Sequence, residues 1–161
     1  QEKLNGMSES IRIISGGFTD IIAPVVEPFG ISRKHIYANS FIFDNDKVVG
    51  CDAENYLTKT EGKVKQLRAL NINQKIIIVG DGYTDIPCFS LVRKDQGIAI
   101  GVYDRKNREK WGRAWGFIED GRVSNLVPTD YREGSGLSDS LIMAVESISA
   151  RILLASHTYQ G

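Results

Sequence analysis

The hydrophobic residues of this chain form short runs that alternate with stretches of helical spacing. Three runs rich in β-branched residues predict buried strands, at residues 11–15, 76–79 and 97–101. Apolar residues recur at helical spacing over residues 18–29, 61–70 and 84–92. Strands that alternate with helices predict a parallel sheet with helices on both faces, which is an α/β, Rossmann-like three-layer fold. The carboxyl ends of the strands then place Ser15, Asp81 and the Gly101 turn at one edge of the sheet.

The segments between these elements carry turn signals. Residues 35–39 and 41–43 are extended in character, and Asp44-Asn45-Asp46 predicts a hairpin turn before residues 47–50. The acidic triplet lacks the glycine and the distal glutamate of a calcium loop, so a solvated turn explains it better. The C-terminal part predicts a charged helix, a hairpin with Asp-Gly at its turn, a polar loop and an amphipathic closing helix, at residues 104–113, 117–123, 129–136 and 137–154.

The composition fits one soluble globular domain, since 42% of the 161 residues are hydrophobic and 25% are charged. The 20 basic and 20 acidic residues balance, which disfavours binding to nucleic acid or to an anionic membrane. No apolar stretch reaches the roughly 20 residues of a membrane span, and the first residues lack a signal-peptide core. Cys51 and Cys88 lack Cys-x-x-Cys spacing, so we expect a reduced, cytoplasmic protein.

Ser15 and the two glycines after it form a candidate phosphate site. A hydroxyl and glycine amides at the start of a helix favour an anion, because helix N-termini attract negative charge. A serine that only caps the helix explains the same pattern. Lys63 lies near the first turn of a predicted helix, where a cation opposes the dipole and suggests an anion opposite, although most helix lysines are simply solvated.

The Gly80-Asp81-Gly82 loop is a candidate metal site. Asp81 follows a predicted buried strand, and open α/β sheets bind ligands at the carboxyl ends of their strands. Asp81 and Asp85 lie four positions apart, and carboxylate oxygens suit a hard cation such as Mg²⁺. An aspartate that caps a helix after a glycine turn is the alternative.

Taken together, these segments resemble the haloacid dehalogenase-like phosphatases and, among them, the phosphoserine phosphatase branch. The resemblance covers about residues 8–101 and rests on four segments, Ser15-Gly16-Gly17, Ala38-Asn39, Gly62-Lys63 and Gly80-Asp81-Gly82-Tyr83-Thr84-Asp85. It implies one core of this family over residues 1–161, with a motif-bearing part at 1–101 and a C-terminal part at 102–161.

The resemblance also implies a role for each matching residue. Ser15 and Gly16 hold the phosphoryl group, and Lys63 is a further phosphate ligand and a catalytic residue. Asp81 binds Mg²⁺, and Asp85 is a second catalytic residue that pairs with Lys63. Thr84, at a position that is often asparagine in relatives, contributes to the phosphate site.

One part of the family pattern is missing. The family carries an Asp-x-Asp motif on its central strand, where the first aspartate is the nucleophile and the second is the general acid. None of the early aspartates follows an apolar strand in that pattern, namely Asp20, Asp44, Asp46 and Asp52. We therefore expect the motif and the family's cap upstream of residue 1. The absent strand would leave a gap of about 10 Å that backbone hydrogen bonds cannot bridge, so a missing N-terminal segment or another chain must complete the sheet.

The resemblance thus implies Mg²⁺-dependent hydrolysis of a small phosphate monoester through an aspartyl-phosphate intermediate, with residues 1–161 alone inactive. The alternative is an inactive family member that binds a phosphorylated ligand or partner. A P-type ion pump shares the Gly-Asp-Gly loop but spans a membrane. A dinucleotide site needs Gly-x-Gly-x-x-Gly spacing, which neither glycine cluster has.

Overall fold

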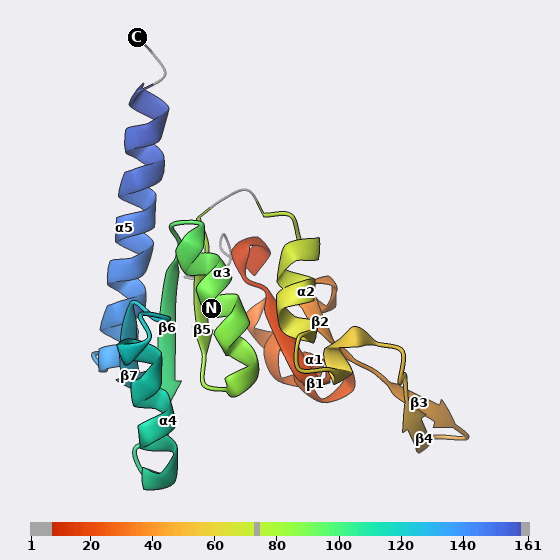
Figure 1. The fold of residues 1–161 in the computed structure, drawn as a ribbon. Helices are drawn as coiled ribbons and strands as arrows, with labels where there is room; N and C mark the ends of the chain where they lie inside the picture. Colours follow the sequence, from red (N-terminus) through yellow and green to blue (C-terminus); the bar gives the residue numbers. More distant parts are fainter. Residues whose placement is uncertain (1–7, 73–74, 159–161) are drawn as a thin grey trace. The chain divides into compact units, whose positions relative to one another are not determined.

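The computed structural model describes residues 8–72 and 75–158, and the chain divides into two compact units, Gln1–Asn71 and Ile72–Gly161 (Figure 1). Each unit contains parallel strands that alternate with helices. The predicted α/β architecture is therefore confirmed. That the two units form a single domain stays a prediction.

The first unit is built on two parallel strands. Strand β1 (Ile13–Phe18) pairs with β2 (Ile36–Asn39), and helix α1 (Thr19–Val26) lies between them in sequence and contacts both. Three 3₁₀ turns connect these elements or follow them, η3 (Glu27–Phe29), η4 (Arg33–His35) and η5 (Tyr56–Thr58). Helix α2 (Gly62–Ala69) contacts β1 and η5, so it closes the unit over the strand that carries Ser15.

A hairpin extends from the first unit, as the sequence predicts (Figure 1). Strands β3 (Phe41–Asp44) and β4 (Lys47–Cys51) pair antiparallel, and Asn45 and Asp46 at the turn have positive φ angles of 46° and 61°. Two positive φ values are typical of a tight hairpin turn. The hairpin is anchored at its base, where the rings of Phe18 and Phe41 stack with centroids 3.9 Å apart.

The second unit has a three-stranded parallel sheet in the order β5 (Ile77–Gly80), β6 (Ile98–Tyr103), β7 (Asn125–Pro128). Its helices are α3 (Ile86–Lys94), α4 (Arg108–Glu119) and α5 (Gly136–Thr158). Alternate residues of β6 pack into two separate clusters: Ile100 and Val102 meet residues of α5, whereas Ala99 meets Phe89 and Phe117 of α3 and α4. The sheet therefore has helices on both faces.

Residues 117–123 do not form the predicted hairpin. Phe117 to Glu119 are the last residues of α4, and Gly121, with φ +63°, ends the helix by donating its N–H to the Ile118 carbonyl at 2.8 Å. An Asp-Gly pair suits a hairpin turn and a helix C-terminus equally, because glycine adopts positive φ at both. The amphipathic helix before it decides the outcome, through the buried side chains of Ala114 and Phe117.

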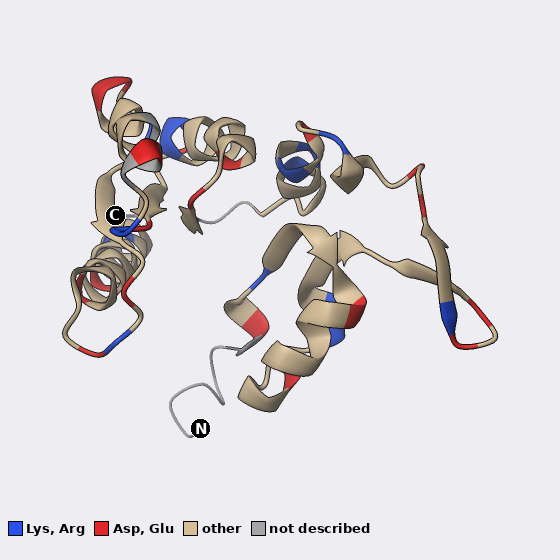
Figure 2. Cartoon of the chain, turned by 90° about the horizontal axis from the view of Figure 1, so that it is seen from below, with Lys and Arg blue, Asp and Glu red and all other residues tan. Residues whose placement is uncertain are grey.

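The predicted polar loop at 129–136 and the closing helix are present, and the helix runs to Thr158. Within the parts of the chain that the structure describes, no helix is long and apolar enough to cross a membrane. Acidic and basic positions are interspersed along both units rather than gathered by sign (Figure 2).

Candidate functional site

Within strand β1, Ser15, Gly16 and Gly17 form an irregular segment, the Ser15 turn. The parallel pairing with β2 joins Ile14 to Tyr37 and resumes only at Phe18 opposite Asn39, so the register skips over Ser15, Gly16 and Gly17. Ser15 Oγ accepts a hydrogen bond from the Gly17 N–H at 3.0 Å, and Gly16 is exposed. Gly16 therefore has no register partner in β2.

Asn39, at the end of β2, holds this segment through its side chain. Its Nδ2 donates a hydrogen bond to the Gly16 carbonyl at 2.9 Å, and the side chain is only 2% exposed. Asn55 supports the same strand end, because its Nδ2 donates to the Ala38 carbonyl at 3.2 Å. The sequence showed Asn39 only as part of the family pattern, without a role, because a side-chain bond across 23 positions has no local signal.

Lys63 is the second residue of α2, in the same unit as the Ser15 turn. Gly62 before it packs so closely on η5 that a Cβ built there would lie 2.1 Å from the Tyr56 carbonyl oxygen. A Cβ on Gly16 would lie 3.6 Å from the Leu57 carbonyl oxygen of the same 3₁₀ turn. The turn η5 therefore contacts both Gly16 and Gly62, and it links the Ser15 turn to the start of the lysine helix.

The second unit holds the loop of Asp81. Asp81 is exposed and follows the last residue of β5, next to the register pair Gly80 and Gly101. Asp85 is 7% exposed and accepts a hydrogen bond from the Gly82 N–H through Oδ2, at 3.0 Å. A Cβ on Gly80 would lie 2.7 Å from the Asp85 carboxyl carbon, so the buried carboxylate requires glycine there. Thr84 is half-buried in the 3₁₀ turn η6 (Tyr83–Asp85).

The predicted site residues thus fall into two groups. Ser15, Gly16 and Lys63 belong to the first unit, and Asp81, Thr84 and Asp85 belong to the second. The predicted pairing of Lys63 with Asp85 joins the two units and stays a prediction, as does a common sheet edge for Ser15 and Asp81.

The donor set of the second unit is compatible with Mg²⁺, although it is small. Asp81 presents carboxylate oxygens at a strand end, and Mg²⁺ is usually bound by one or two carboxylates together with water and substrate phosphate. In the described residues, no group of three or more His, Cys, Asp or Glu side chains gathers in one place. A dedicated cage of the kind that binds zinc or calcium is therefore not indicated there.

The chain has one Asp-x-Asp triplet, Asp44-Asn45-Asp46, and it lies at the tip of the β3–β4 hairpin. Each residue from Lys47 to Cys51 on the paired strand is exposed. This triplet is therefore a solvated turn, as predicted, and does not lie at the end of a parallel strand.

Four parallel strands have an open edge within the described residues, namely β1, β2, β5 and β7. Strand β1 pairs with β2 on one side, and β5 pairs with β6 on one side, with no second partner for either. The apolar strand β5 is accordingly exposed in part, with Val79 41% exposed. An unpaired strand edge offers N–H and C=O groups to an incoming strand.

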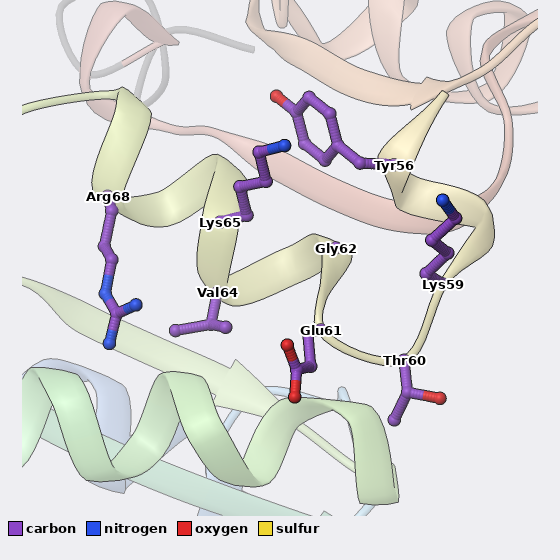
Figure 3. Close-up of a pocket in the computed structure, with 8 residues that line it drawn as sticks. All are labelled: Tyr56, Lys59, Thr60, Glu61, Gly62, Val64, Lys65 and Arg68. Carbon is purple, nitrogen blue, oxygen red and sulfur yellow. The ribbon is translucent and has the colours of Figure 1, made fainter. Parts of the chain in front are cut away.

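A pocket of about 610 Å³ lies beside η5 and the first turns of α2 (Figure 3). Lys65 and Lys59 point to the side of Tyr56, and Lys65 Nζ lies 4.7 Å from the Tyr56 ring centroid. Arg68 and Glu61 point the other way (Figure 3). Lys63 is not among the lining residues, and the charges do not converge on one point, so this pocket is not the predicted phosphate site.

A comparison with protein-family models agrees with this arrangement. The model described as haloacid dehalogenase-like hydrolase matches residues 9–90, which is half of the chain and includes the Ser15 turn, Lys63 and the Asp81 loop. The chain belongs to the haloacid dehalogenase-like hydrolase family. The resemblance predicted from the sequence is therefore confirmed.

Curated members of the family are similar over the same region. The chain is 34% identical over 89 residues to the chloroplastic phosphoserine phosphatase of Arabidopsis thaliana, covering 53% of this chain and 30% of that protein. It is 33% identical over 88 residues to the phosphoserine phosphatase of Drosophila melanogaster, covering 52% and 33%. The human enzyme is 31% identical over 88 residues, with 52% and 39% covered. The chain thus spans about a third of the length of the curated relatives it matches.

A solved structure shares the fold. The phosphoserine phosphohydrolase-like protein from Francisella tularensis subsp. tularensis SCHU S4 superposes with a TM-score of 0.53 at 23% identity, covering 78% of this chain and 56% of that chain. This similarity extends beyond the matched family region into the C-terminal part. The cytoplasmic location stays a prediction, since the Arabidopsis relative is described as chloroplastic.

Proposed function

We propose that this chain is the phosphate-binding and metal-binding part of a Mg²⁺-dependent phosphomonoesterase. One observation carries the proposal: Lys63 and Asp81 each follow a glycine whose contacts leave no room for a side chain. A Cβ on Gly62 or Gly80 would lie within 3 Å of neighbouring atoms, so both residues are held at defined places, one at a helix start and one at a strand end. The family match and the phosphoserine phosphatase relatives support the same reaction.

In the first unit, Ser15 Oγ and the Gly16 N–H are proposed to donate hydrogen bonds to phosphoryl oxygens. The Lys63 ammonium, from the same unit, adds positive charge where negative charge develops during phosphoryl transfer. Ser15 positions the phosphate and is not a nucleophile, because it does not lie in a Gly-x-Ser-x-Gly elbow. Thr84 is proposed to add a hydroxyl to the phosphate site.

In the second unit, Asp81 is proposed to hold Mg²⁺, and Asp85 to orient the loop around it. A bound Mg²⁺ would neutralise charge on the phosphoryl oxygens. The Gly82 N–H already fixes one oxygen of Asp85, so this carboxylate is oriented before any ligand arrives. Its proposed partner is Lys63.

The nucleophile is proposed to be an aspartate on a strand outside residues 1–161. In the family's reaction its carboxylate oxygen attacks phosphorus, the ester P–O bond breaks, and the leaving oxygen takes a proton from the second aspartate. Water then attacks phosphorus and releases inorganic phosphate and the free carboxylate. The open edges of β1 and β5 support this proposal, because an additional strand would satisfy their unpaired backbone groups.

The alternative is a phosphate-binding module without turnover, which would use the same Ser15 and Lys63 site. The enzyme and the module differ in whether the full-length protein turns over substrate. We would assay it with phosphoserine and Mg²⁺, beside residues 1–161 alone. The enzyme hypothesis expects turnover by the full-length protein and none by the fragment. Phosphate binding without turnover by the full-length protein would favour the module, and turnover by the fragment would refute the external nucleophile.

The metal role has its own test in the full-length protein. Asp81→Ala removes the proposed ligand, so we expect Mg²⁺ binding by calorimetry to disappear and turnover to fall by at least about 100-fold. Asp95→Ala is the matched control, because Asp95 is an exposed aspartate of the same unit that follows α3 at the opposite end of β6. Unchanged Mg²⁺ binding in Asp81→Ala would contradict the assignment.

A further inference from the structure

Asn39 combines two features that a core side chain rarely shares. It is among the most deeply buried residues of the chain, at 2% exposed, and it is polar. Its Nδ2 bonds to the Gly16 carbonyl at 2.9 Å, while its Oδ1 is buried without a hydrogen-bond partner in the structure. Buried amides normally pair both ends, so an unpaired Oδ1 is unfavourable for stability.

Packing alone does not explain an amide at this position. Leucine has the same branching and the same number of side-chain heavy atoms, and an apolar side chain would remove the unpaired acceptor. What leucine could not supply is the N–H donor to Gly16. The N–H donor therefore explains why an amide occupies this position although its oxygen is unpaired.

The bonded carbonyl lies where the strand register breaks. The ladder between β1 and β2 has no register pair at Ser15, Gly16 or Gly17. Asn39, itself paired with Phe18 in the ladder, reaches back to that group with its side chain. The peptide between Gly16 and Gly17 is thus held at both ends, by Asn39 Nδ2 on the Gly16 carbonyl and by Ser15 Oγ on the Gly17 N–H.

We propose that Asn39 is a positioning residue for the phosphate cradle, which it holds open for a phosphoryl group by fixing the Gly16 carbonyl. This inference rests on the proposed function, since it assigns the Ser15 turn to phosphate binding. With the carbonyl held on the Asn39 side, the Gly16 and Gly17 amides and Ser15 Oγ stay in one arrangement. Without the bond, only the Gly17 N–H to Ser15 Oγ bond holds this peptide, and the exposed Gly16 can rotate its carbonyl toward the phosphate, which would repel it.

The test uses two variants of the full-length protein. Asn39→Leu keeps the branching and the number of side-chain heavy atoms and removes the donor at every pH. Asn39→Asp removes the donor at neutral pH, but a buried carboxyl has a raised pKa and, once protonated, donates through its O–H to the same carbonyl. Ser140→Ala is the control, because Ser140 is a buried, hydrogen-bonded polar residue of the other unit.

The measurement is the affinity for inorganic phosphate in the presence of Mg²⁺, relative to wild type at pH 7.5 and at pH 5, with the melting temperature recorded for each variant. Loss of one hydrogen bond to the cradle should weaken phosphate binding by roughly tenfold in both Asn39 variants at pH 7.5. At pH 5, Asn39→Asp should approach wild type while Asn39→Leu stays weak. Ser140→Ala should lower the melting temperature and leave phosphate affinity unchanged.

Several results would overturn the inference. A folded Asn39→Leu protein with wild-type phosphate affinity would show that the donor is not needed. The same conclusion would follow if the phosphate affinities of Asn39→Asp and Asn39→Leu changed identically between pH 7.5 and pH 5. If neither variant folds, Asn39 is a core residue and the inference is wrong. A wild-type protein that does not bind phosphate would instead remove the proposed function, and this inference with it.

Discussion

Strands β6 and β1 have similar apolar sequences but different surroundings. In the second unit, β6 lies between two partners, and its four middle residues are buried. In the first unit, β1 has one partner, and none of its six residues is fully buried. The strands of a parallel sheet are normally covered on both faces. The comparison shows that the second unit has a central strand with partners on both sides. Strand β1 has an apolar sequence typical of a central strand, but it pairs on one side only among the described residues.

The two units also hold their candidate residues differently. The Ser15 turn is held by side chains distant in sequence, chiefly Asn39. The Asp81 loop is held locally, by Asp85 on the Gly82 amide three positions away. A core substitution in the first unit should therefore disturb the Ser15 turn more than a core substitution in the second unit disturbs the Asp81 loop.

The largest expected effect is a difference in stability loss between a buried and an exposed phenylalanine. Phe89 is 0% exposed and meets Phe117 edge to face at 5.8 Å, so Phe89→Ala should lower the free energy of unfolding by about 4 kcal/mol. Phe43, on the hairpin, is 54% exposed, so Phe43→Ala should cost less than about 1 kcal/mol. Urea unfolding measures both losses. Equal losses would contradict the contrast between a buried centre and a solvated hairpin.

The next effect tests the close contact beneath Lys63. Gly62→Ala should destabilise by about 2–3 kcal/mol, because a Cβ there would lie 2.1 Å from a backbone oxygen that cannot yield cheaply. Gly116→Ala, within α4, meets nothing within 4 Å and should stabilise by up to about 1 kcal/mol through helix propensity. Denaturant titration of the two variants gives the comparison. A neutral Gly62→Ala would mean that η5 does not fix the start of α2.

The smallest effect concerns one carboxylate in each unit. The Phe41 backbone N–H, followed by Arg33, lowers the pKa of Asp20, and the Arg132 guanidinium lowers the pKa of Asp130 to about 2. A lowered pKa means that the charged form stabilises the fold above the unfolded value of 3.8. The contribution of Asp130 is then lost as the pH falls from 3.8 to about 2. Asp20 and Asp130 are partly exposed, at 25% and 29%, and their arginine partners are more exposed, so the gain is small and salt-sensitive.

Nuclear magnetic resonance titration of the carboxyl carbons checks the two pKa values. Asp20→Asn and Asp130→Asn should each flatten the acid limb of the unfolding curve slightly, because the asparagine does not titrate. A carboxyl pKa at or above 3.8 for either residue would contradict the assigned hydrogen bonds.

The sequence by itself determined the local elements and the positions of the candidate chemistry. Hydrophobic periodicity predicted β1, β5 and β6 and the helices after them, because burying one face of a short element depends on nearby residues. Glycine pairs next to Ser15 and Asp81 marked both turns, since only glycine permits the observed close contacts at Gly80. The family could be recognised because these local signals recur in a fixed order along the chain.

Tertiary structure alone decided the features that depend on distant contacts. Asp120-Gly121 ends a helix rather than turning a hairpin because Phe117 packs against Phe89 and Ala99. Asn39 gains its bond to Gly16 only when β2 lies beside β1, and Gly62 meets Tyr56 only when α2 folds back on η5. Such contacts join residues whose spacing follows no helical or strand period. The single partner that β1 and β5 each have among the described residues is likewise a result of tertiary pairing.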